Sequence, residues 1–273
     1  MRKCWTAALA GILAAAGGAA CAAPAGAQAP AGTVGGAPPP DPVRFILALD
    51  PGHGGRDAGS RGPGPVLEKD FTLRIASLLA ERLRRRPGVK VILTREGDTE
   101  ISPAQRAEVA NYNVANLFIS IHADASWRKG ARGPAVLVAS PQRPPTAGGE
   151  SSEAAAARWQ RGQNVHLAAS HRFAQGLAER FRRIRARVRV PLRVLPVRAL
   201  EGAKMAAVYV SMGVISTPEE MARLREMKIG NPYLGALEAE VARFARLPEK
   251  APEAKPGAGL SPGAPSAVPG GGG

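Results

Sequence analysis

Residues 45–60 read FILALDPGHGGRDAGS and join an apolar run to a glycine-rich loop that contains a histidine. The apolar run Phe45–Leu49 is typical of a strand that is buried on both faces. The next three residues, Asp-Pro-Gly at 50–52, end that strand in a turn. His53 follows among glycines, which let a backbone turn sharply and approach a ligand closely. The stretch therefore predicts a buried strand that delivers a histidine into a tight loop.

Working outward from this strand, further apolar runs alternate with helical patterns. The additional strands are expected at 89–94, 117–121, 133–139, 194–197 and 206–210, and the helices at 71–83, 105–113, 165–184 and from 218 onward. Thr217 and Glu220 have the spacing of a capping box, with Pro218 in the first turn. Residues 140–165 are rich in Pro, Gly, Ser and Ala and are expected to form a surface insertion. Together these patterns predict an α/β fold: one domain with a twisted, mostly parallel sheet flanked by helices.

The N-terminus has the features of an export signal over residues 1–27. Arg2 and Lys3 are followed by an apolar run that is too short to span a bilayer permanently. An A-x-A site at 25–27 predicts cleavage before Gln28. The alternative is a lipoprotein box with Cys21 as the lipid-anchored residue. Either route predicts an exported protein of the periplasm or cell envelope.

The composition divides the rest of the chain into a domain and two tails. Residues 28–42 are expected to form a flexible linker and residues 248–273 a disordered tail, because both are rich in Ala, Pro and Gly. The domain therefore occupies 43–247. The chain has two Cys, both within the first 21 residues, which excludes a disulfide scaffold and a thiolate zinc site in the domain.

Three side chains with metal-binding chemistry follow strand ends or precede a helix. His53 follows the first strand, Glu68 lies just before the first helix, and His122 follows the third strand. Two histidines, one carboxylate and an open fourth position form a common catalytic zinc set. Each residue alone has a simpler explanation, such as a turn residue or a first-turn acid at a helix N-terminus. The combination favours a metal site, although spacing alone does not fix the metal.

The chain resembles the zinc-dependent N-acetylmuramoyl-L-alanine amidases of the type 3 kind. The matching stretches lie in the family's order at 46–60 (ILALDPGHGGRDAGS), 67–83 (LEKDFTLRIASLLAERL), 91–111, 117–126 (LFISIHADAS) and 208–220. The resemblance implies one bound Zn²⁺ on His53, Glu68 and His122. It also implies cleavage of the amide between muramic acid and L-alanine in peptidoglycan. The matching Thr94-Arg95 and 106–111 are expected to be structural or substrate-positioning residues.

The chain departs from the family pattern at one catalytic position. Where the family carries a Glu that acts as general base on the attacking water, this chain has Ser211. A serine hydroxyl is no base at neutral pH, and a positioned acid–base group contributes roughly 100- to 10,000-fold to a rate. Glu201, in the loop before this strand, is a candidate substitute, and Asp124 is another nearby carboxylate. Simple loss of the base predicts a slow enzyme.

The chain is strongly basic, with a formal net charge of +15. Eleven Arg and a single acid, Glu179, lie between Arg158 and Arg198. This stretch forms either an ordinary solvated surface or a contact with an anionic polymer or a partner such as an activating envelope protein. No nucleic-acid motif accompanies the charge, so a nucleic-acid partner is not expected.

Three functions compete on these observations. The first is a zinc-dependent peptidoglycan hydrolase that takes part in cell-wall remodelling. The second is a catalytically impaired amidase-like protein that binds peptidoglycan or regulates other wall hydrolases. The third, an electrostatic envelope-binding protein without metal, leaves the three ligand residues as coincidence.

Overall fold

The sheet has six strands, and their order is β2-β1-β3-β6-β4-β5. The computed structural model describes residues 42–140 and 150–247, with the side chains of 150–163 left out. The strands are β1 (Phe45–Pro51), β2 (Val89–Leu93), β3 (Leu117–Asp124), β4 (Ala135–Ala139), β5 (Leu192–Leu195) and β6 (Ala206–Val214). The helices are α1 (Glu68–Arg84), α2 (Pro103–Tyr112), α3 (Glu150–Ile184), the short 3-10 helix η1 (Arg198–Leu200), α4 (Pro218–Arg225) and α5 (Pro232–Phe244).

Most neighbouring strands are parallel, as the sequence predicts. β2, β1, β3 and β6 run in one direction, and β4 pairs antiparallel with β6. β5 is parallel to β4, so the last two strands of the sheet both run in the opposite direction. The start of β4 therefore lies beside the end of β6, where Ala135 pairs with Ser211.

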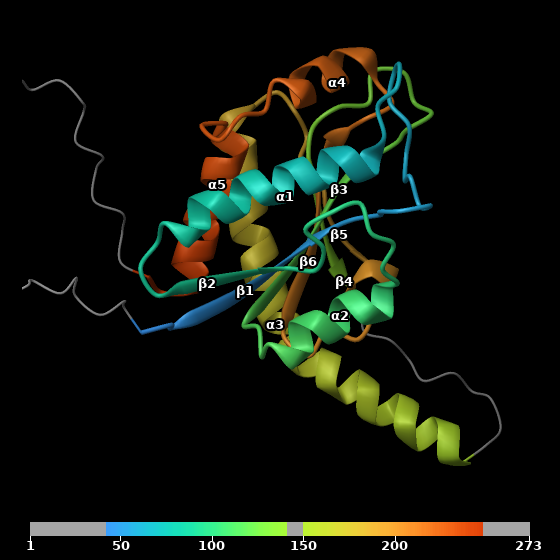
Figure 1. Ribbon diagram of the computed structural model, residues 1–273, viewed down its shortest axis with the longest axis vertical. Helices are drawn as coiled ribbons and strands as arrows, with labels where there is room; N and C mark the ends of the chain where they lie inside the picture. The colour runs from blue at the N-terminus through green and yellow to red at the C-terminus, as the bar shows by residue number, and fades with distance from the viewer. Residues whose placement is uncertain (1–41, 141–149, 248–273) are drawn as a thin grey trace, which may run out of the picture. The chain divides into compact units, whose positions relative to one another are not determined.

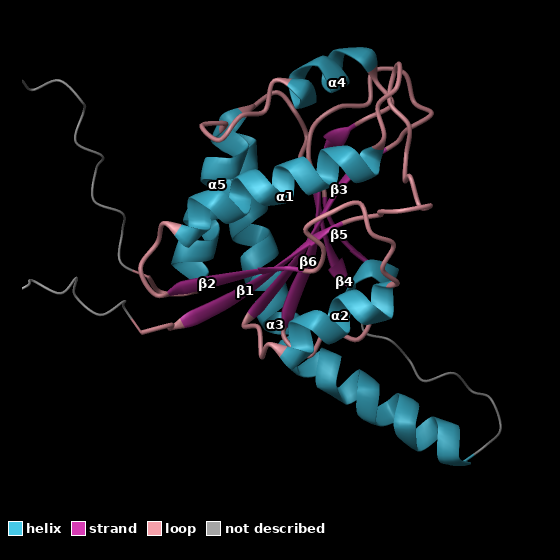
Figure 2. Ribbon diagram, in the orientation of Figure 1, coloured by secondary structure: helices cyan, strands magenta, loops and turns pink. Residues whose placement is uncertain are grey.

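Alternate residues of the strands feed two separate apolar cores. Leu47, Ile119 and Val208 point to one face, where they pack with apolar residues of α1, α3 and α5. Phe118 and Ala207 point to the other face, towards α2 and η1. Figures 1 and 2 show helices on both sides of the strands, with α1 crossing beside α5. The sheet therefore has the two covered faces that parallel strands require.

Two expectations from the sequence are wrong in detail. The helix expected from residue 165 begins at Glu150, so only part of the expected insertion can be irregular. Thr217 does not cap α4 with its side chain, because its hydroxyl donates to the Ala131 carbonyl at 2.9 Å. Glu220 is buried and accepts from the Gly133 N–H at 2.7 Å rather than closing a capping box.

Helix α5 is not among the helices expected from the sequence. Its start nevertheless has clear local signals, since Asn231 caps the Tyr233 N–H and Pro232 occupies the first turn. None of the helices within 42–140 and 150–247 is long and apolar enough to cross a membrane. The expected signal peptide (1–27), the linker up to residue 41 and the tail (248–273) lie outside the described residues.

Candidate metal centre

His53, Glu68 and His122 converge at the carboxyl-terminal edge of the parallel strands. His53 follows β1, Glu68 is the first residue of α1, and His122 lies near the end of β3. One ligand atom from each lies within 4.8 Å of the other two. The Glu68 carboxylate lies between the rings, with Oε2 at 3.2 Å from His53 Nε2 and Oε1 at 3.0 Å from His122 Nδ1. The structure thus brings together the three residues that the sequence singles out.

The main chain fixes the Glu68 carboxylate in this position. The Ser60 N–H donates to Oε2 at 2.8 Å, and the Ala123 N–H donates to Oε1 at 3.0 Å. Burial by itself raises the pKa of Glu68, but hydrogen bonds and charge from His122 and His53 outweigh burial and hold that pKa well below its usual range. Glu68 is therefore an anion that is oriented before any ligand arrives.

His53 is oriented by a carboxylate on its other nitrogen. Its Nδ1 lies 2.9 Å from Asp57 Oδ2, and the loop places His53 in the left-handed region at φ 61°. Burial lowers the pKa of His53, but contacts with Glu68 and Asp57 outweigh it, so the net pKa is raised. A carboxylate on Nδ1 keeps a proton there and turns the Nε2 lone pair towards the site, which is the usual support of a metal-binding histidine.

The donor set fits a divalent metal ion. With its proton on Nδ1, His53 presents a lone pair to a carboxylate oxygen only 3.2 Å away. Two such acceptors repel each other unless a proton or a metal ion lies between them, and this pair is therefore able to hold either. Two imidazoles and one carboxylate also match the ligand chemistry of catalytic zinc sites that keep an open position.

Two glycines make room for the imidazole rings. A Cβ on Gly52 would lie 2.3 Å from His122 Cε1, so no side chain fits there. Gly59 has φ +65°, and a Cβ on it would lie 2.6 Å from the His53 ring. The sequence expectation that glycines allow close backbone approach therefore holds at these two positions.

Two buried arginines hold the loop that carries His53. Arg95 donates to the carbonyls of Pro51 and Gly52 at 2.9 Å. Arg106 donates to Asp50 at 2.8 Å, and also to the carbonyl oxygens of Pro51 and His53. The sequence leaves a structural and a substrate-positioning role open for Arg95 and Arg106. The contacts of both arginines are structural, because they hold the loop backbone.

Tyr209 supports His122, one of the three residues of the candidate metal centre. Its ring stacks on His122 at 4.3 Å between centroids, with 15° between the planes. Its hydroxyl donates to Asp124 Oδ1 at 2.5 Å. Burial, followed by the charge of Asp124, raises the pKa of Tyr209, so this hydroxyl stays protonated.

Ser211 lies on β6 directly opposite His122 of β3. The two residues are Cα partners, and the Ser211 side chain is buried. Its hydroxyl accepts from the Asp124 N–H at 3.2 Å and donates to the Gly213 carbonyl at 3.0 Å. The hydroxyl is therefore engaged with the backbone of the two strand ends.

Glu201 is not brought to the three ligands. It follows η1, and the adjacent Gly202 carbonyl accepts from Asn111 near the end of α2. That position precedes β6, whereas His53 and His122 lie where β1 and β3 end and Glu68 lies where α1 begins. Glu201 thus lies before the start of β6, whereas Ser211 lies towards its end.

Sequence reasoning missed two residues that contact the ligands, Asp57 and Tyr209. The signal for Asp57 is its spacing of four residues from His53 within a glycine-rich loop. The signal for Tyr209 is weaker, since an aromatic residue in an apolar strand is most simply a core residue. Its contact with His122 depends on the pairing of β6 with β3, which local sequence does not reveal.

Comparison with known proteins identifies the family. Residues 47–237 match the model of the N-acetylmuramoyl-L-alanine amidase family. A probable N-acetylmuramoyl-L-alanine amidase of Haemophilus influenzae, AmiB, is 45% identical over 101 residues. That alignment covers 36% of this chain and 23% of the relative, so the chain matches only about a quarter of that protein's length.

Solved structures share the fold. The catalytic domain of CwlV, an N-acetylmuramoyl-L-alanine amidase from Paenibacillus polymyxa, superposes with a TM-score of 0.61 at 24% identity, over 75% of this chain and 99% of that one. The CwlD amidase of Clostridioides difficile, solved in complex with the GerS lipoprotein, gives 0.59 at 20% identity, over 74% and 98%. With the family model spanning most of the domain, the chain belongs to the N-acetylmuramoyl-L-alanine amidase family.

Proposed function

We propose that this protein is a zinc-dependent amidase that cleaves the bond between N-acetylmuramic acid and L-alanine in peptidoglycan. The observation that carries the proposal is the convergence of His53, Glu68 and His122 at one edge of the sheet. These residues would hold a Zn²⁺ ion, which supplies Lewis-acid polarisation of the scissile carbonyl when bound. Membership of the amidase family gives the substrate class.

The roles of the chain's own residues follow from their contacts. The main-chain N–H groups of Ser60 and Ala123 orient Glu68, and Asp57 holds the proton on His53 Nδ1. Tyr209 packs against His122 and limits rotation of its ring. Preorganised ligands of this kind require little rearrangement when metal and substrate bind.

Ser211 sets the expected rate. We infer that position 211 is that of the family's general base and that its hydroxyl cannot take this role, because a serine hydroxyl is no base at neutral pH and its oxygen already accepts from the Asp124 N–H. Without a positioned base the reaction is expected to be slow, by roughly 100- to 10,000-fold. Glu201 is a poor substitute, since it lies at the other end of β6.

The second candidate function is an amidase-like protein that binds peptidoglycan or regulates other wall hydrolases. The engaged Ser211 hydroxyl favours it, because the ligands could hold metal and substrate without turnover. Both functions place the protein outside the cytoplasm, in the periplasm or envelope, as a free or Cys21-anchored protein. An activating envelope protein is a partner that fits either function, as CwlD is found with a lipoprotein.

Turnover by the mature protein separates these functions. The purified protein is given muropeptide after chelation and again after reloading with zinc, and the released peptide is measured. Zinc-dependent release supports the amidase. Absence of release at full zinc occupancy, with and without an envelope extract as a source of activator, supports the binding protein.

A further inference from the structure

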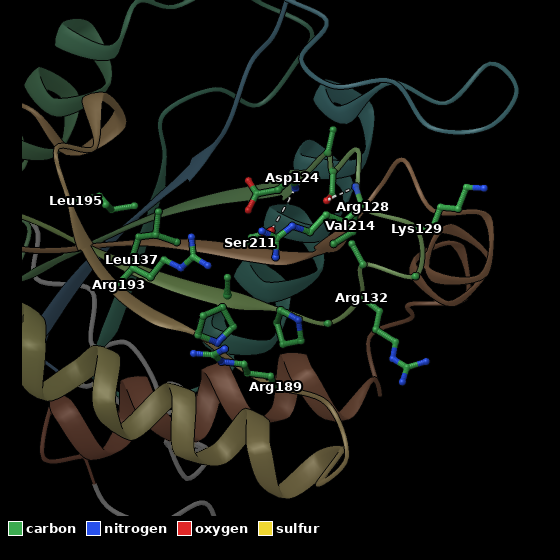
Figure 3. A pocket seen from close by; sticks show the side chains of 18 residues that line it. Asp124, Arg128, Lys129, Arg132, Leu137, Arg189, Arg193, Leu195, Ser211 and Val214 are labelled. Atoms are coloured by element: carbon green, nitrogen blue, oxygen red, sulfur yellow. Dashed lines mark hydrogen bonds between the residues drawn. The ribbon is translucent and has the colours of Figure 1, made fainter.

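A basic cavity adjoins Ser211. Its volume is about 500 Å³, and Asp124, Ser211 and Val214 line its inner end. The apolar Leu137 and Leu195 contribute to its wall (Figure 3). Five cationic side chains line the rest of this basic cavity: Arg128, Lys129, Arg132, Arg189 and Arg193.

These cations come from two segments that are far apart in the sequence. Arg128, Lys129 and Arg132 belong to the loop between β3 and β4, whereas Arg189 lies in the segment before β5 and Arg193 lies in β5. Figure 3 shows Arg189 and Arg193 on one side of the cavity and Lys129 and Arg132 at its opposite end. The fold therefore gathers positive charge around a hollow rather than spreading it over one solvated helix face.

Within the described residues, no acid forms an ion pair with the cations of the basic cavity. Asp124 is the one acid in the lining, and it already accepts from Tyr209 at 2.5 Å. Elsewhere in the domain buried acids are paired with arginines, as Glu238 is with Arg82 and Arg86. Unpaired cations around a hollow favour an anionic ligand.

The basic cavity lies next to the metal centre on the same face of the sheet. His122 and Ser211 are Cα partners on neighbouring strands, and Ser211 and Ala135 are partners on the next pair. Adjacent strands are about 4.8 Å apart, so the cavity begins one strand beyond His122. A peptide substrate whose scissile bond lies at the metal centre would reach the basic cavity within one or two residues of that bond.

We propose that the basic cavity binds the carboxylates of the peptidoglycan stem peptide on the far side of the scissile amide. Beyond its L-alanine the stem peptide carries free carboxylates, one of them on the γ-linked D-glutamate, and the guanidinium groups around the cavity are suited to bind them. Arginine binds carboxylates with charge-assisted and often bidentate hydrogen bonds. The proposal rests on the proposed function, because the metal centre defines which side of the substrate enters the cavity.

The test is equilibrium binding of a synthetic stem tripeptide, L-Ala-γ-D-Glu-meso-diaminopimelate, to the zinc-loaded mature protein. The cavity variant is the double substitution Arg189→Gln and Arg193→Gln. The matched control is Arg172→Gln with Arg187→Gln, which removes the same charge from exposed positions outside the cavity. A second probe is the same peptide with its carboxylates amidated, and a third is inorganic phosphate.

The cavity variant is expected to bind the tripeptide at least about tenfold more weakly than wild type. The control should bind like wild type, and the amidated peptide should bind as weakly to wild type as the tripeptide does to the variant. Equal binding by the variant overturns the proposal. Phosphate that binds in the cavity more tightly than the tripeptide also overturns it, in favour of a phosphate-rich polymer. Cavity-dependent binding without any turnover would leave the inference standing while the amidase activity fails.

Discussion

His122 provides the sharpest test of the metal centre at the level of single residues. We predict that His122→Ala loses most of its zinc, because a ring nitrogen that lies 3.0 Å from Glu68 is removed and two ligands remain. Metal analysis after dialysis measures the occupancy. His171→Ala, which changes a histidine of α3 that is not part of the centre, should keep about one zinc per chain. Full occupancy in His122→Ala would contradict the ligand assignment.

Position 211 is where we propose that a general base is missing. We predict that Ser211→Glu raises amidase activity by a factor on the order of 100 or more, since it places a carboxylate opposite His122. The longer side chain has room, because Ser211 lines the basic cavity. Release of peptide from denuded peptidoglycan is measured at equal zinc occupancy.

Ser211→Gln is the matched control, with the same length and no carboxylate. It should remain as slow as wild type if the gain comes from proton transfer. A wild type that is already fast and unaffected by Ser211→Glu would show that another group acts as the base. Asp124 would then be the first residue to replace, because its backbone N–H contacts Ser211 and its carboxylate lies at the end of β3.

At the level of elements, the end of β1 and the loop after it depend on a buried ion pair. Arg106 of α2 and Asp50 of β1 are both buried and lie 2.8 Å apart, and Thr94 and Ser120 also donate to Asp50. We predict that Arg106→Gln lowers the free energy of unfolding by about 3–5 kcal/mol, because it leaves a buried carboxylate without its counter-charge. Denaturant unfolding of the zinc-free protein measures the loss.

The exposed pair between Arg56 and Glu100 provides the control for Arg106. Its arginine is almost fully exposed, so Arg56→Gln should hardly change the free energy of unfolding. If Arg106→Gln lowered the free energy of unfolding no more than Arg56→Gln does, the buried pair would not hold β1 to α2.

The sequence predicts correctly those elements whose position depends on their own residues rather than on distant contacts. The continuous apolar runs gave β1 and β3 near their observed positions, and the glycine-rich loop after β1 marked His53. Local patterns failed where distant residues compete. Thr217 and Glu220 have capping spacing, but the loop between β3 and β4 offers them the Ala131 carbonyl and the Gly133 N–H instead.

The same reasoning explains the incomplete prediction of the site. His53, Glu68 and His122 are visible from their positions at strand and helix ends, because parallel strands bring such positions to one edge. The stacking of Tyr209 on His122 and the basic cavity require the order of β3, β6, β4 and β5, which a single sequence does not give. The sequence predicts too late a start for helix α3, because the alanine-rich residues after 150 directly follow a Pro- and Gly-rich segment, although alanine itself favours helix.

Over the whole molecule, the distribution of charge follows from where the acids lie. Buried Glu220 and Glu240 are each paired with nearby arginines, among them Arg223 and Arg243. Because these glutamates are buried in ion pairs, they do not neutralise cations elsewhere in the domain. The cations of the basic cavity are among those left without an acid partner. Within the described residues, the positive charge is therefore concentrated at local clusters of cations such as the basic cavity.

Export is the prediction that concerns the chain as a whole. We predict that residues 1 to about 20–27 are removed, because a basic start, a short apolar run and small-residue cleavage sites follow one another. Mass spectrometry of protein from the envelope fraction identifies the new N-terminus as Gln28 or as a lipid-modified Cys21. Cys21→Ala separates the two alternatives. If cleavage occurs before Gln28, the substitution changes neither the mass nor the location of the mature protein. If Cys21 carries the lipid, the substitution removes the membrane anchor. An intact Met1 on cytoplasmic protein would contradict export, and it would separate the metal centre from the peptidoglycan it is proposed to cleave.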